Sequence, residues 1–296
     1  MRVFTSAAAL QHDPGFGHPE RPIRLDTVLA ALNGRPGIQL VEAYPAPLEA
    51  LHSCHDPAYL DRARTLSTDG GGELGPDTIL NPWSWNAVLG ATGAVLEALD
   101  HSLTTGANTF AAIRPPGHHA LHNRAMGFCV VNHVVVAAHA ARRAGRSRVL
   151  IVDWDVHHGN GTQALVENDP DIRFISMHQW PWYPGSGAID EHGVGNVFNV
   201  PMSAGLPAAT YVIALWRAIE RATTGWRPDL VLISAGYDGM RGDPLGGFTL
   251  EPGDFVTWTE RLRERFPGTP IVGVMEGGYA PARLAEGVVA TVTALS

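Results

Sequence analysis

The chain has 296 residues, of which 45% are hydrophobic and 17% charged, a composition typical of a globular protein with a large core. The formal net charge of −8, without a stripe of Lys and Arg, argues against direct nucleic-acid binding. Only two cysteines occur, the first residues do not form a signal peptide, and no uncharged apolar stretch reaches the roughly 18 residues needed to span a bilayer. We therefore expect a cytoplasmic protein with no disulfide framework and no contact with membranes.

Hydrophobic periodicity predicts strands and helices that alternate along the chain. Strands are expected at residues 2–5, 38–43, 109–113, 148–152, 172–177, 196–200, 229–234 and 270–275. Helices are expected at residues 23–32, 57–66, 83–99, 132–143, 159–167, 207–223, 252–264 and from about 280. Repeated strand–helix units with short connections favour a mostly parallel sheet with helices on both faces. Because no linker divides the chain, residues 1–296 are expected to form a single domain.

Loops are expected at residues 12–22, 67–82, 179–195 and 235–249, and the first two are candidates for a functional role. Residues 12–22, HDPGFGHPERP, are rich in Gly, Pro and His and follow a strand, which makes them a candidate rim of a site. Residues 67–82 contain three consecutive Gly and are expected to form a long loop without regular structure. Such a loop in a compact domain is usually functional.

The segment 150–161, LIVDWDVHHGNG, combines a buried strand with a dense group of polar residues. Its apolar run has no polar alternation, as in a strand that is covered on both faces. In open α/β sheets the chemistry lies at the carboxyl ends of the strands. Asp155 and His157, two residues apart, point to the same side of an extended segment, and they amount to two thirds of a zinc site that keeps a position open for water. A solvated polar turn is the plainer alternative.

Three further strands are followed by polar residues that can do chemistry. These residues are His118 and His119 after strand 109–113, Asp238 and Asp243 after strand 229–234, and Glu276 and Tyr279 after strand 270–275. Core histidines and capping aspartates would explain one or two such groups. Four groups at what should be one edge of a sheet favour a functional site.

The segments RPPGHHA, DWDVHHGNGT, SAGYDGMRGDPLGG and EGGY, in this order, resemble the signature segments of the zinc-dependent histone deacetylase and acetylpolyamine amidohydrolase family. With HPERPIRL near the start and PGSG at 184–187, the resemblance runs from about residue 12 to 280. It implies the arginase/deacetylase fold, a single α/β domain with a central eight-stranded parallel sheet and helices on both faces.

The resemblance also implies a metal site and its reacting groups. Asp155, His157 and Asp238 would bind one catalytic Zn²⁺, which lowers the pKa of a bound water toward about 7. His118 and His119 would form a tandem pair near that water, and Tyr279 would donate its hydroxyl to the carbonyl oxygen that becomes the oxyanion.

Two neighbours would tune the tandem pair. In the family pattern Asp153 hydrogen-bonds His118, whereas Asn160 falls where some relatives have a second Asp. This resembles the class II pattern, leaves His119 less basic and favours it as the general base, with His118 more readily charged.

The substrate channel is implied by position as well. Phe128, with Gly127 beside it, and Tyr183 match the two aromatic walls, although the second wall is usually Phe. Leu245 matches a rim position where polyamine-preferring relatives carry an acidic residue, and Asp77 would contact the substrate backbone. Arg24 resembles the arginine of an internal cavity below the metal, and structural K⁺ sites are implied around Asp153 and Ser176. The carboxylates of Glu20, Asp77 or Glu191 could also stand at the rim.

The leading interpretation is a zinc amidohydrolase that removes acetyl or other acyl groups from lysine side chains of peptides and proteins, or from similar amines. An acetylpolyamine amidohydrolase with the same site is the alternative, and Leu245 favours the lysine substrate. A catalytically weak acyl-lysine binder and an arginase-like binuclear manganese hydrolase are further alternatives. Tyr279 and the complete ligand set argue against the first of these, and the tandem His118–His119 against the second. No particular oligomeric state is predicted.

Overall fold

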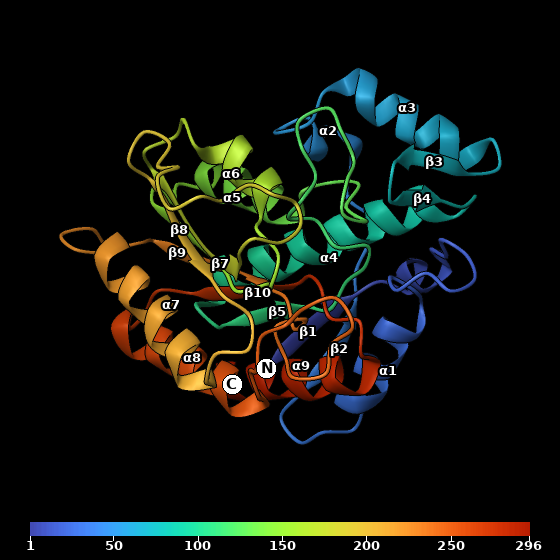
Figure 1. Ribbon diagram of the computed structural model, residues 1–296. Helices are drawn as coiled ribbons and strands as arrows, with labels where there is room; N and C mark the ends of the chain where they lie inside the picture. Colours follow the sequence, from blue (N-terminus) through green and yellow to red (C-terminus); the bar gives the residue numbers. More distant parts are fainter.

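The computed structural model describes residues 1–296 and contains an eight-stranded sheet between two layers of helices (Figure 1). The strand order is β2-β1-β5-β10-β9-β6-β7-β8, and every neighbouring pair is parallel. The strands are β1 (Arg2–Thr5), β2 (Gln39–Glu42), β5 (Thr109–Ala111), β6 (Val149–Asp153), β7 (Ile172–Gln179), β8 (Val197–Met202), β9 (Leu230–Ala235) and β10 (Ile271–Met275). The predicted parallel α/β sheet is confirmed.

Helices cover both faces of the sheet. One layer contains α4 (Ser84–Thr105), α5 (His133–Arg143) and α6 (Asn160–Val166), and the other contains α1 (Ile23–Leu32), α7 (Ala208–Ala222), α8 (Pro252–Arg265) and α9 (Pro281–Leu295) (Figure 1). Helix α3 (Pro57–Thr68) packs on α4, and its first amides are capped by the side chain of Asp56. None of these helices combines the length and the apolar character that crossing a membrane requires.

Two short helices were not predicted, the 3-10 helix η1 (Ala7–Gln11) and α2 (Leu48–Leu51). Each has about one turn, which is too short to show a helical period in the sequence.

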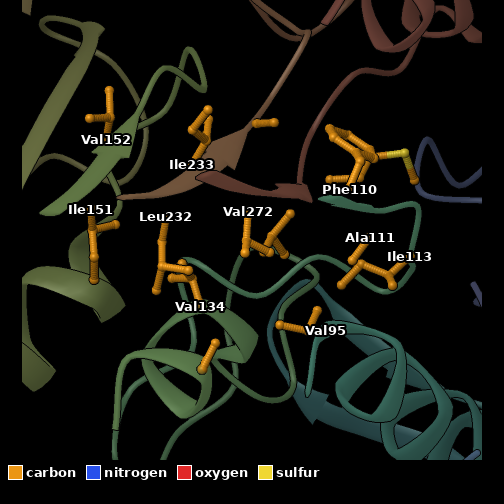
Figure 2. Packing of buried hydrophobic residues seen from close by; sticks show 14 of the residues in the cluster. Val95, Phe110, Ala111, Ile113, Val134, Ile151, Val152, Leu232, Ile233 and Val272 are labelled. Atoms are coloured by element: carbon orange, nitrogen blue, oxygen red, sulfur yellow. The ribbon is translucent and has the colours of Figure 1, made fainter. Parts of the chain in front are cut away.

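The core lies on both sides of the central strands. In Figure 2, Ile151 and Leu232 point to the side where Val134 of α5 packs, and Val152 and Ile233 point to the opposite side. Strands β6, β9 and β10 are buried along their whole length. This burial explains why their sequences are unbroken apolar runs, since a strand covered on both faces has no exposed side to carry polar residues.

The expectation of a structureless loop at 67–82 is wrong. Helix α3 extends to Thr68, and β3 (Gly72–Gly75) and β4 (Thr78–Leu80) then pair as an antiparallel hairpin that turns at Pro76 and Asp77. Strands of three and four residues carry too little alternation to be recognised, and the glycines of this segment resemble those of a loop.

The strand order explains how distant motifs meet. Strands β5, β10, β9 and β6 are consecutive in the sheet, although they come from very different parts of the chain. Because they are parallel, the segments that follow them leave the sheet at the same edge.

Candidate active site

Asp155, His157 and Asp238 form a buried group whose potential ligand atoms all lie within 4.8 Å of one another. The Nδ1 atom of His157 is 3.1 Å from an oxygen of Asp155 and 3.1 Å from an oxygen of Asp238. Two carboxylates and one imidazole are a donor set that suits a divalent ion such as zinc and leaves coordination positions open. The chain thus has a group that could bind a metal, made of the three residues that the resemblance implied.

Backbone amides fix the carboxylates of this group. The amide of Gly277 donates to Asp155 Oδ2 over 2.9 Å, and the amide of Val156 donates to Asp238 Oδ1 over 2.8 Å. A Cβ on Gly277 would lie only 2.1 Å from Asp238 Oδ2, so this position requires glycine. The EGGY segment after β10 therefore packs directly against the two carboxylates.

The charges of the group depend on one another. Burial alone would lower the pKa of His157, but the carboxylates of Asp238 and Asp155 raise it above its ordinary value. Burial and the nearby charge of Asp155 raise the pKa of Asp238, whereas burial of Asp155 is outweighed by the rings of His118 and His157, which hold its pKa low. Concentrated negative charge of this kind attracts a cation.

His118 and His119 lie side by side, with ring centroids 4.0 Å apart. His118 Nδ1 is 2.9 Å from a carboxylate oxygen of Asp153, and His119 Nδ1 is 2.7 Å from the amide oxygen of Asn160. Because both partners are acceptors, each imidazole donates from Nδ1 and keeps Nε2 free for another role.

The two histidines differ in proton affinity. Burial opposes the charged form of His118, but the carboxylates of Asp155 and Asp153 outweigh it and raise the pKa of His118 well above the ordinary value. Burial, together with the rings of His118 and His157, lowers the pKa of His119 well below it. A neutral His119 beside a more readily charged His118 is the arrangement expected when Asn160 replaces a second carboxylate.

Glu276 and Asp243 have structural partners that the sequence did not reveal. The carboxylate of Glu276 accepts hydrogen bonds from the amides of Gly117 and His118, at 2.6 and 3.2 Å. Asp243 binds the backbone of Tyr279 and of the rim residue Leu245. These contacts join segments that follow different strands. The sequence showed that Glu276 and Asp243 each follow a strand, but not that they bind these partners.

Tyr279 is buried at the same edge, with its ring against a cation. The guanidinium carbon of Arg24 lies 4.8 Å from the centre of the Tyr279 ring, and Arg24 also donates to the carbonyls of Glu276 and Gly278. Burial raises the pKa of Tyr279 well above its ordinary value, so its hydroxyl stays a donor at neutral pH.

A cavity of about 230 Å³ opens at this edge. The predicted channel residues line it, together with two histidines of the site, the tyrosine after β10 and one tryptophan. The lining residues are Asp77, His119, Gly127, Phe128, His157, Trp182, Tyr183, Leu245 and Tyr279. Trp182 was not predicted as a lining residue, because a Trp in a loop is more often a packing residue.

Two of the three suggested rim carboxylates are not at the rim. Glu20 is fully buried and forms ion pairs with Arg24 and Arg114. Glu191 accepts from Gln163 and from backbone amides of its own loop. Asp77 is therefore the single carboxylate among the lining residues.

Comparison with known proteins agrees with this geometry. The family description "Histone deacetylase domain" matches residues 18–295. The chain belongs to the histone deacetylase family. Membership makes this protein a hydrolase of the deacetylase type, as the sequence predicted.

Several family members are similar over most of the chain. The histone deacetylase-like amidohydrolase of Pseudomonas aeruginosa is 38% identical over 286 residues, which are 92% of this chain and 75% of that protein. The polyamine deacetylase HDAC10 of Homo sapiens is 37% identical over 298 residues, which are 93% of this chain and 44% of that protein. The crystal structure of the HDA15 HD domain superposes with a TM-score of 0.94 at 35% identity, and the match covers 100% of this chain and 90% of the other.

Proposed function

We propose that this family member is a zinc-dependent amidohydrolase that removes acetyl or other acyl groups from lysine side chains, or from similar linear amines. One observation carries the proposal: the buried Asp155–His157–Asp238 group adjoins a cavity that is also lined by His119 and Tyr279. Asp155, His157 and Asp238 would hold the Zn²⁺. When bound, the ion supplies Lewis acidity toward the acyl carbonyl and makes a bound water more acidic.

The tandem histidines would move the protons of the reaction. Neutral His119 has Nε2 free to accept a proton from the attacking water, while Asn160 holds its Nδ1–H. His118, held by Asp153, carries the positive charge more readily and assists protonation of the departing amine. Water and amide then give a carboxylic acid and a free amine.

Tyr279 would stabilise the developing negative charge on the carbonyl oxygen. Its hydroxyl stays protonated because burial raises its pKa, and its ring is held by Arg24. A donor that is already in place costs no rearrangement when the charge develops.

The channel supports a linear, uncharged stem. Phe128 and Tyr183 offer aromatic walls, Gly127 packs against the His119 ring, and Leu245 adds an apolar contact. Acyl-lysine in a peptide or protein fits this lining, and acylated polyamines are the second candidate because one relative is named a polyamine deacetylase. Structural K⁺ near Asp153 and Ser176, a single deacetylase domain over residues 1–296, and a cytoplasmic location remain predictions.

Metal analysis of the purified protein tests the proposal. We expect one equivalent of Zn²⁺ per chain and hydrolysis of an acetyl-lysine peptide. Asp155→Ala, His157→Ala and Asp238→Ala should each lose metal and activity together. Two equivalents of manganese, with inhibition by zinc, would instead support the arginase-like alternative and refute the proposed function.

A further inference from the structure

A single carboxylate contacts both walls of the channel. Asp77 lies at the turn of the β3–β4 hairpin, and its Oδ1 accepts a 2.9 Å hydrogen bond from the amide of Gly127. Its Oδ2 accepts a 2.9 Å hydrogen bond from the hydroxyl of Tyr183. Gly127 carries the first wall, Phe128, and Tyr183 is the second wall. The two oxygens of Asp77 thus tie the walls to each other.

The first wall has a backbone that needs such support. Phe128 has a φ of 65° and is the one residue other than glycine with a positive φ. This conformation is unfavourable for a bulky side chain and persists only where surrounding contacts determine it. Gly127 also packs tightly on the general-base candidate, since a Cβ there would lie 2.2 Å from the His119 ring. A shift of this turn would therefore move both Phe128 and the surface beside His119.

The second wall is the more exposed one. Tyr183 has 38% of its surface exposed, and its ring meets the His119 ring edge-on with centroids 5.2 Å apart. Its hydroxyl bond to Asp77 is the polar contact that fixes its outer end. The neighbouring Trp182 donates from its indole N–H to the carbonyl of Leu245 over 2.9 Å. Polar contacts thus connect the β3–β4 hairpin, the loop that carries Trp182 and Tyr183, and the loop that carries Leu245 around the cavity.

We propose that Asp77 is a specificity-determining residue that sets the width of the substrate channel by holding Gly127–Phe128 and Tyr183 at a fixed separation. The proposal rests on the proposed function. An unbranched acyl-amine stem fits between the two rings, and a branched or cyclic stem requires them to move apart. In this role the carboxylate of Asp77 binds other residues of the protein. The family resemblance instead implied that Asp77 contacts the backbone of the substrate. It depends on Tyr183, because a Phe at this position would leave Oδ2 without its partner.

Small acetamides distinguish a role of Asp77 in holding the channel walls from a role in binding the substrate backbone, because they have no peptide backbone. We would compare kcat/KM for a linear N-alkylacetamide with that for an N-(cyclohexylmethyl)acetamide, and for an acetyl-lysine peptide. The variants are Tyr183→Phe, which removes only the hydroxyl, Asp77→Ala, and the double variant. Glu73→Gln is the control, because Glu73 is an exposed residue on the same hairpin whose carboxylate makes no hydrogen bond.

The wild-type protein should prefer the linear acetamide. Tyr183→Phe should reduce this preference about five- to tenfold, the size expected for loss of one hydrogen bond. Asp77→Ala also removes the acceptor of the Gly127 amide and should reduce the preference at least as much. The double variant should show less than the product of the two effects, since both substitutions break the same contact. Glu73→Gln should keep the wild-type preference.

An unchanged preference in Tyr183→Phe and Asp77→Ala would overturn the proposal. An Asp77→Ala effect confined to the peptide would also overturn it, since that outcome indicates a backbone contact. Dissociation constants of the two acetamides, measured by calorimetry in a Tyr279→Phe background where turnover is slow, give the preference in binding alone. If no substrate is hydrolysed but the binding ratio still falls in the variants, the proposed function fails while the role of Asp77 stands. A ratio that does not change in binding refutes the role of Asp77 independently of activity.

Discussion

Asp243 accepts a 2.6 Å hydrogen bond from the backbone amide of Tyr279. The same oxygen accepts from the amide of Ala280, at 3.2 Å, and the other oxygen accepts from the amide of Leu245, at 2.9 Å. Ala280 precedes helix α9 and offers no side-chain cap of its own. Asp243 therefore accepts from the amides just before helix α9 and holds the backbones of both Tyr279, the proposed oxyanion donor, and Leu245, which lines the cavity.

Asp243→Asn should lower kcat by about tenfold or more with little change in KM and in zinc content. The amide group of Asn offers one acceptor oxygen, so the backbone amides on one side face an NH₂ group instead of an acceptor. The loop that carries residue 243 then shifts, and its hold on the Tyr279 backbone weakens. Steady-state kinetics with metal analysis measures this effect. Asp243→Asn in the Tyr279→Phe background should cause little further loss of kcat, because both substitutions act through the hydroxyl of Tyr279. Asp56→Asn, at the cap of α3, is the control and should keep the wild-type kcat. A full additional loss in the double variant contradicts a positioning role.

Tyr279→Phe should reduce kcat on the order of 10²–10³ while zinc content stays unchanged, because one oxyanion donor is lost and the ring volume is retained. The Arg24–ring contact does not involve the hydroxyl and should persist. The measurement is turnover of an acetyl-lysine peptide by zinc-loaded protein. Near-normal turnover would show that another group stabilises the oxyanion.

Leu245→Glu should shift the substrate ratio toward acetylpolyamines. A polyamine carries a second ammonium, and an apolar Leu245 leaves it without a partner, at a cost that can reach several kcal/mol. Asp77, the other candidate, already accepts hydrogen bonds from Gly127 and Tyr183. We expect the wild-type protein to have higher kcat/KM for acetyl-lysine peptides than for acetylspermidine or acetylputrescine. Leu245→Gln, similar in size to Glu but neutral, should not produce the shift. A tenfold preference of the wild-type protein for acetylpolyamines would reverse this substrate assignment and leave the zinc mechanism intact.

The free energy of unfolding should fall in mild acid, because the neutral form of His55 stabilises the folded protein. Burial lowers the pKa of His55 to about 4, and its Nε2 accepts the amide of Asn132 over 2.9 Å, which a protonated ring cannot do. In the unfolded chain a histidine has a pKa near ~6.5 and binds the proton first. The contribution of His55 is therefore complete above about pH 6.5 and is lost as the pH falls toward 4. The loss amounts to roughly 2 kcal/mol of the free energy of unfolding by pH 5.

Urea unfolding at pH 7.5 and pH 5.0 measures this loss. His55→Gln cannot take up a proton, so the variant should lose less stability between the two pH values than the wild-type protein loses. Other buried histidines contribute to both proteins equally and cancel in the comparison. The same pH dependence in both proteins would contradict the role of His55.

Much of the fold and several site residues could be predicted from the sequence, because the relevant signals are local. Unbroken apolar runs such as 149–152 indicate strands buried on both faces, and polar residues directly after such strands must lie at the edge of a parallel sheet. Asp155 and His157 could be paired by their two-residue spacing alone. The roles of His118, His119 and Tyr279 came from motif resemblance, and the structure brings these side chains to the same edge.

Only the tertiary structure decided which distant residues are partners. Asp77 lies 50 residues from Gly127 and 106 from Tyr183, and the hairpin that carries it was mistaken for a loop because its strands are so short. Glu20, suggested as a rim carboxylate, is instead buried against Arg114, 94 residues away. Hydrophobic periodicity reports whether a residue faces the core of its own helix or strand. The partner of a carboxylate depends on which strands become neighbours in the sheet, and that order is fixed by packing over the whole chain.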